Sequence, residues 1–295
     1  MEDYCGFLSS PWEIEFSTGK FIPVENFRDL VQEALNASNE DGFCYPPTQK
    51  DIACSWDGVV SKTASSTKRP ALLYRIPVTH KILFSNSEKL ELEDLRKGKS
   101  GFILHLLAFL SGHQGQFIDW WITGRFQAQP RAPFYADLKM VQGIVTKAEK
   151  LWETLEAKAK TRLTTLLFCR NRLHAYEWPW EEFAFGYMVL DGIWKWQASM
   201  SAAGEKVPHS ERINVLCKRR GLMVDGDAAQ KIMKTRNELF HETIWSGDTP
   251  GMGTGSAGFE ELFLLKKLLN QLLVRCIGYE GCLPPWTISA SYALQ

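Results

Sequence analysis

Residues Phe259–Ile277 read FEELFLLKKLLNQLLVRCI, a Leu-rich stretch with no Pro or Gly inside it. This composition and length predict a strongly apolar α-helix, and Gly278 marks its end. Much of the chain ahead of it also contains many helix-forming residues and few breakers. We therefore expect an all-α helical bundle over residues 136–295. Its roughly five helices should be one long helix or two in series within Tyr135–Trp178, then Trp180–Met200, Glu211–Arg220, Asp225–Ile244 and Phe259–Ile277.

The first 135 residues have a different texture, in which helical and strand-like segments are mixed. Phe27–Ala37 has helical spacing, and the apolar run Phe102–Leu110 predicts a buried helix. Gln116–Phe126 is rich in β-forming residues and predicts a strand. The sequence therefore predicts an α+β protein. We expect a smaller mixed α/β domain over residues 1–135 to precede the helical domain, where it would sense a trigger or hold substrate.

Composition limits the classes of function. Lys plus Arg and Asp plus Glu both number 34 in 295 residues, so net charge indicates no particular partner. A nucleic-acid surface would have to be a local patch. The seven cysteines are odd in number and include no CxxC pair, which argues against a disulfide framework and a zinc knuckle. The six histidines include no HExxH or other zinc spacing, so we expect neither a metal nor a cofactor.

The sequence also predicts a cytoplasmic protein without a membrane segment. The most apolar run, GFILHLLAFL at Gly101–Leu110, is too short to cross a bilayer. The N-terminal residues MEDYCGFLSSPWEIEF have neither the basic nor the apolar region of a signal peptide. Unpaired cysteines fit a reducing compartment.

One predicted helix has a charged residue within its apolar stripe. Lys231–Ile244 reads KIMKTRNELFHETI, and at 100° per residue its apolar side chains gather on one side with Arg236 among them. A guanidinium keeps its charge in a protein, so burying it without a partner is costly. Arg236 therefore needs a carboxylate, a carbonyl, a phosphate or a wet interface. The apolar side chains of this stripe are Ile232, Met233, Leu239, Phe240 and Ile244.

Two further polar residues border this stripe. Asn237 and His241 are four positions apart and share a helix face, whereas Arg236 and His241 should point about 140° apart on a regular α-helix. One helix would thus hold the Arg–His pair loosely, and two such helices in a dimer would surround one cleft. These side chains suit RNA cleavage, because histidine can move the two protons and arginine can stabilise phosphate charge. On spacing alone, an ordinary surface role is the commoner explanation.

Other basic residues lie near this helix in the sequence. They fit an RNA-binding surface, and they fit an ordinary solvated face equally well. The sequence RNRLH at Arg170–His174 has one residue fewer between Arg and His, and we interpret it as a structural pair. The candidate RNA-binding residues are Lys218, Arg219, Arg220, Lys231 and Lys234.

The stretch RNELFH, Arg236–His241, resembles the R-N-x-x-x-H form of the motif of HEPN domains. The run Glu182–Trp194 (EFAFGYMVLDGIW) looks like the aromatic-rich second helix of Apea-like HEPN domains. Leu262–Leu283 (LFLLKKLLNQLLVRCIGYEGCL) looks like their last helix with its Gly-Tyr-x-Gly ending. The resemblance covers roughly residues 150–285.

This resemblance implies a helical bundle that forms a homodimer and cleaves RNA without metal, leaving a 2′,3′-cyclic phosphate. Arg236 would bind the phosphate, His241 would be the acid or base, and Asn237 would support both. Glu238 and Glu242 are candidates for supporting roles. The resemblance further implies prokaryotic antiviral defence, as in abortive infection, or a toxin that a regulatory protein partner restrains.

Two other functions remain open on the sequence. The same bundle could be a catalytically inactive module for dimerisation and for RNA or nucleotide binding. It could also be a protein-interaction scaffold, in which Arg236 only pairs with an acidic partner.

Overall fold

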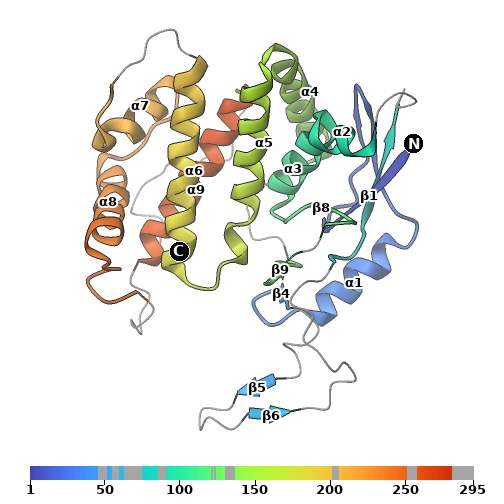
Figure 1. Ribbon diagram of the computed structural model, residues 1–295, viewed down its shortest axis with the longest axis horizontal. Helices are drawn as coiled ribbons and strands as arrows, with labels where there is room; N and C mark the ends of the chain where they lie inside the picture. The colour runs from blue at the N-terminus through green and yellow to red at the C-terminus, as the bar shows by residue number, and fades with distance from the viewer. Residues whose placement is uncertain are drawn as a thin grey trace. The chain divides into compact units, whose positions relative to one another are not determined.

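The computed structural model combines α-helices with short antiparallel strands, so the prediction of an α+β protein is confirmed (Figure 1). Contacts divide the chain into two units, Met1–Val145 and Thr146–Gln295, and the division falls within helix α4, Leu138–Thr154. Each unit is described by itself below. The described residues are 1–45, 52–54, 60–62, 75–85, 91–120, 122, 124–129, 137–200, 206–250 and 258–280.

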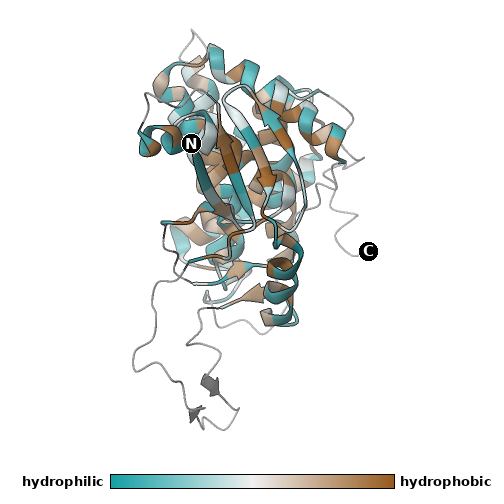
Figure 2. Ribbon diagram, turned by 90° about the vertical axis from the view of Figure 1, so that its right-hand side faces the viewer, coloured by the Kyte–Doolittle hydropathy of each residue, from teal (hydrophilic) through white to brown (hydrophobic). Residues whose placement is uncertain are grey.

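The N-terminal unit is built on a five-stranded antiparallel sheet, whose strands carry both hydrophobic and hydrophilic segments (Figure 2). Burial alternates along the middle strand of this sheet, β7: His80, Ile82 and Phe84 are buried, and Lys81 and Leu83 are half-buried. This period of two gives the strand one face toward the core. In spatial order the strands are β2 (Ile14–Phe16), β3 (Gly19–Pro23), β7 (His80–Phe84), β1 (Glu2–Gly6) and β8 (Gln116–Phe117).

The helices of this unit agree with the sequence pattern. Helix α1 spans Phe27–Ala37 as predicted. Helix α2 (Leu92–Lys97) leads into α3 (Lys99–Ser111), and α3 is buried over Ser100–Ser111, around its whole circumference. The predicted buried helix is thus confirmed, because only a helix that is apolar on all sides can be enclosed in this way.

The predicted strand Gln116–Phe126 is wrong in part. Strand β8 ends after two residues, because the chain turns and the N–H of Trp120 donates to the carbonyl of Phe117. Short two-stranded pairings involve other segments of the unit. These are β4 (Phe43–Cys44) with β9 (Phe126–Gln127) and β5 (Ile52–Cys54) with β6 (Val60–Lys62).

Three histidines are buried in the N-terminal unit, and they predict that acid destabilises it. Burial lowers the pKa of His80 to about 3 and the pKa values of His105 and His113 to about 4. In the unfolded chain each pKa is about 6.5. The unfolded state therefore binds more protons below neutral pH, so stability falls as pH falls from about 7 toward 4.

Between pH 7.5 and 6.0 each histidine should cost about 0.8 kcal/mol, or about 2 kcal/mol for the three together. Urea unfolding of the full chain at the two pH values measures this difference. The matched variant His113→Gln should lose about a third of the pH dependence. An equal midpoint for the N-terminal unit at both pH values would contradict the prediction.

The C-terminal unit is helical, and α6 is its central element. Helix α6 packs against α5 and α9, and α8 packs against α9 (Figure 1). The approach to α5 is close at Gly192, where an added Cβ would lie 2.6 Å from Leu166. One side of α6 therefore faces the core of this unit. Its helices are α5 (Ala157–Asn171), α6 (Pro179–Met200), α7 (Arg212–Arg219), α8 (Gly226–Asn237) and α9 (Phe259–Cys276).

Helix α8 departs from the prediction at its C-terminal end. Its start is as expected, since the side chain of Asp225 accepts the N–H of Asp227 as an N-cap. The expected continuous helix to Ile244 is wrong, because the α-helix ends at Asn237 and a π-helical turn, Glu238–Glu242, follows. The N–H of Thr243, which has a φ of 58°, donates to the carbonyl of Glu238 and closes this wider turn.

Within the described ranges, no helix has the length and apolar character needed to cross a bilayer.

Candidate functional site

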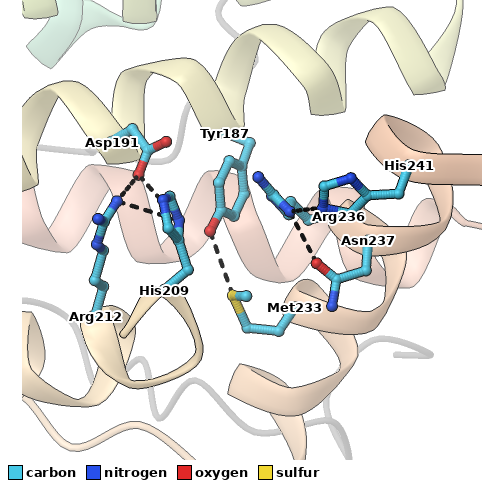
Figure 3. A network of polar contacts seen from close by, with 8 residues as sticks. All are labelled: Tyr187, Asp191, His209, Arg212, Met233, Arg236, Asn237 and His241. Carbon is cyan, nitrogen blue, oxygen red and sulfur yellow. Dashed lines mark hydrogen bonds and ion pairs between the residues drawn. The ribbon is translucent and has the colours of Figure 1, made fainter. Parts of the chain in front are cut away.

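The π-helical turn brings Arg236 and His241 into direct contact. Nη1 of Arg236 lies 2.6 Å from Nε2 of His241 (Figure 3). The expectation that the two side chains point about 140° apart is therefore wrong. It assumed an uninterrupted α-helix, whereas a π-turn pairs residues five apart. A single chain holds the Arg–His pair together through this local change of helix type.

The contact defines the direction of the hydrogen bond. A guanidinium has only donors, so Nη1 of Arg236 donates and Nε2 of His241 accepts. The same Nη1 donates to Oδ1 of Asn237 at 2.9 Å. His241 is exposed, so its Nδ1–H side can meet a ligand from solvent. Asn237 and His241 together fix the orientation of one edge of the guanidinium.

Two aromatic rings flank Arg236. Its Cζ lies 5.7 Å from the ring centroid of Tyr187 and 5.5 Å from that of Phe240, within range of a cation–π contact. Tyr187 is buried and its hydroxyl lies 3.3 Å from Sδ of Met233, whereas Phe240 is half exposed. Nε of Arg236 is buried and meets no acceptor in the described part of the chain. Arg236 is thus clamped on one edge, and its Nη2 is left for an anion.

Two lysines of α8 and one glutamate of the π-helical turn form ion pairs. Glu238 pairs with Lys234 at 3.6 Å, and Lys231 pairs with Glu260 of α9 at 2.7 Å. Glu242 is exposed beside His241 in the sequence. The two lysines are therefore partly neutralised, which weakens their attraction for a phosphate backbone.

The basic residues at the end of α7 contact aromatic side chains. The guanidinium of Arg219 lies over the ring of Trp194, and that of Arg220 lies over Trp196. Arg220 also donates to the carbonyl of Arg275 at 3.5 Å. Lys218 is exposed next to them. These contacts hold the two arginines against Trp194 and Trp196 of α6.

A pocket of about 380 Å³ opens beside Arg236. Helix α6 supplies most of its wall, with side chains one turn apart on one face, and Arg236 and Phe240 supply the rest. This volume lies in the lower part of the range of small-molecule sites. The residues of α6 that line the pocket are Tyr187, Met188, Asp191, Gly192 and Lys195.

Asp191 joins the pocket to a second polar cluster (Figure 3). Nη1 of Arg212 donates to Oδ1 of Asp191 at 3.0 Å and to Nδ1 of His209 at 3.1 Å. Burial lowers the pKa of His209, the carboxylate of Asp191 opposes this shift, and Arg212 adds to it. Nδ1 of His209 therefore acts as an acceptor here. Among the described residues, no three His, Cys, Asp or Glu side chains are grouped so as to hold a metal ion.

These residues were missed in the sequence because they come from different helices. The available signal was weak: Asp191 is the single acidic residue inside the apolar run Phe183–Trp194, where a carboxylate needs a partner. The partner, Arg212, lies 21 positions later in the chain. Spacing on one helix does not reveal such a pair.

A larger pocket, of about 700 Å³, lies in the N-terminal unit. It lies around Ile22–Asn26, at the end of β3 and just beyond it, and its charged side chains are Glu25 and Lys81. Lys81 already pairs with Glu2 at 3.5 Å. Size alone would favour this pocket, but the smaller one borders the Arg–His contact and has the more convergent chemistry.

The pair Arg170–His174 is a buried structural network, as we interpreted it from the sequence. Arg170 donates through Nε to Oδ1 of Asn270 at 2.8 Å, and its Nη1 lies 3.4 Å from Nε2 of His174. Nδ1 of His174 lies 3.6 Å from Glu182, which also pairs with Lys266 at 2.6 Å. Arg170 and His174 are 2% and 5% exposed, so neither can meet an RNA strand.

Comparisons with known proteins add nothing to this geometry. No family model matches the sequence, and neither the search of curated proteins nor that of solved structures finds a match. The features that point to a function are therefore the side chains of the site and the motif that Arg236 and His241 form.

Proposed function

We propose that this protein is a metal-independent RNA endonuclease of the HEPN class, with Arg236 and His241 at its active site. The observation that carries the proposal is the 2.6 Å contact between Nη1 of Arg236 and Nε2 of His241 at an exposed position. The contact supports the proposal because a guanidinium can bind phosphate and a neighbouring imidazole can exchange a proton near neutral pH.

The proposed reaction is a transesterification. The 2′-oxygen attacks the adjacent phosphorus, the bond from phosphorus to the 5′-oxygen breaks, and the products are a 2′,3′-cyclic phosphate and a 5′-hydroxyl. One proton leaves the 2′-hydroxyl and one reaches the departing 5′-oxygen, which calls for a base and an acid. Arg236 stabilises the phosphate oxygens in the transition state through Nη2.

Each of the two proton transfers requires its own group. Within the proposal, a homodimer supplies a second His241 across the cleft, which completes the acid and base. The resemblance to HEPN domains extends this to a cytoplasmic role in antiviral defence or as a toxin, with a regulatory protein partner. A binding module is the alternative that the geometry favours next, because a guanidinium that already donates to its histidine can hold a phosphate without cleaving it.

The test is RNA cleavage by the purified full chain in buffer with excess EDTA. We expect an RNA oligonucleotide to be cut and the same DNA sequence to stay intact, because DNA lacks the 2′-hydroxyl. End-group analysis should find 2′,3′-cyclic phosphates and 5′-hydroxyls. Cleavage that disappears in EDTA and returns with Mg²⁺ contradicts the metal-independent reaction. Binding of RNA without any cleavage supports the binding module instead.

A further inference from the structure

The pocket beside Arg236 combines three kinds of surface that a nucleotide would need. Met188 and Phe240 are each about half exposed and form apolar walls. Arg236 and Lys195 bring positive charge to the pocket. Asp191 brings a carboxylate, whose side chain is 28% exposed. A ligand that fits all three has a flat apolar body, an anionic group and a hydrogen-bond donor.

Asp191 is held in place with one oxygen still available. The contacts of Asp191 in the described part of the chain, with Arg212 at 3.0 Å and with His209 at 3.8 Å, are both made by Oδ1. Oδ2 can therefore accept from a ligand in the pocket. Since Arg212 fixes the carboxylate, little side-chain entropy is lost when the ligand binds.

We propose that this pocket is a base-recognition subsite that selects an RNA nucleotide with amino and imino N–H donors, guanine above all. Guanine presents two adjacent donors, whereas adenine and cytosine present one amino group next to a ring acceptor. Uracil presents carbonyl oxygens around its one imino group, and Asp191 repels them. The stacking surface of Phe240 accepts any base, so selection comes from the carboxylate. The inference rests on the proposed function, because it takes the ligand to be RNA.

The position of the pocket agrees with this assignment. Arg236 lines the pocket and also contacts His241, so a base held against Asp191 and Phe240 has its phosphate close to the proposed reactive pair. Asp191 and Lys195 are one turn apart on α6. Lys195 can therefore bind a further phosphate oxygen while Asp191 holds the base.

The experiment measures binding of the four nucleoside 5′-monophosphates to the 295-residue chain by calorimetry. These ligands have no internucleotide bond, so binding is read without cleavage. We expect GMP to bind at least about 10-fold more tightly than UMP, with AMP and CMP between them. In Asp191→Asn the amide offers N–H groups instead, so the preference for GMP over UMP should disappear or reverse.

Two further variants keep the test decisive. Glu211→Gln changes an exposed carboxylate outside the pocket and should leave all four affinities unchanged. Phe240→Ala removes an exposed side chain and should weaken all four by about 10-fold, because stacking tolerates every base. If Asp191→Asn fails to fold, an equal loss for all four ligands in Phe240→Ala together with the GMP preference of the unaltered protein still supports the subsite.

The possible outcomes test the proposed subsite and the proposed nuclease activity separately. Preferential GMP binding that depends on Asp191, without RNA cleavage, upholds the subsite and overturns the proposed function. RNA cleavage with equal affinities for the four nucleotides overturns the subsite and leaves the nuclease in place. The same holds if RNA is cleaved and the affinities do not change in Asp191→Asn.

Discussion

The His241→Ala variant is expected to cleave RNA about 10²–10⁴-fold more slowly than the unaltered protein in buffer with excess EDTA, since general acid–base groups contribute about that much. The loss is chemical and not structural, because His241 is exposed and its side chain contacts Arg236 at the surface. Initial rates with a labelled RNA oligonucleotide give the ratio. RNA binding by the variant should persist, since Arg236 still offers Nη2 to phosphate and its Nη1 no longer contacts a histidine.

The matched control is Gln230→Ala, an exposed position on the same helix that does not line the pocket. It should cleave RNA at the unaltered rate, because alanine is a good helix former. Urea midpoints for both variants should agree with that of the unaltered chain within the error of the measurement. Undiminished cleavage by His241→Ala would move the active site away from this pair.

Local sequence patterns predicted much of the fold because the elements concerned depend on their own residues. Phe27–Ala37 forms a helix over the expected range, and Phe259–Cys276 forms one that ends just ahead of Gly278, whose φ of 84° no other residue adopts readily. The prediction of a strand over Gln116–Phe126 was wrong in part, because this element does not depend on its own residues alone. Its pairing depends on strands distant in the chain, and a turn after Phe117 interrupts it.

The motif residues of the candidate site could be named from the sequence, but their geometry and the residues that other helices contribute could not. The motif identified Arg236, Asn237 and His241, yet the α-helical period placed the first and last apart. The π-helical turn that brings them together ends at Thr243, a β-branched residue in the left-handed region. Such a conformation is costly and is retained where the surrounding structure imposes it, commonly at functional sites. No periodicity in the sequence signals it.

Arg170→Ala is expected to lower the free energy of unfolding of the helical unit by about 3–5 kcal/mol, the usual effect of removing one member of a buried charged network. Asn270 and His174 would each lose their contact with the guanidinium, and Glu182 would lose a nearby positive charge. Burial lowers the pKa of Arg170 to about 10, so it is charged at neutral pH. Urea unfolding followed by circular dichroism measures the loss.

Two variants show whether the loss of stability comes from the lost hydrogen bonds of the polar network or from the lost side-chain volume. Arg170→Met refills much of the space without restoring a donor, so it should remain nearly as unstable as Arg170→Ala if hydrogen bonding is the cause. Lys158→Ala, at an exposed position of the same helix, should change stability by less than about 0.5 kcal/mol. The informative contradiction is an Arg170→Ala protein with unaltered stability that no longer cleaves RNA. That result would make Arg170 and His174 a second reactive pair, reached by an opening of the bundle between α5 and α9.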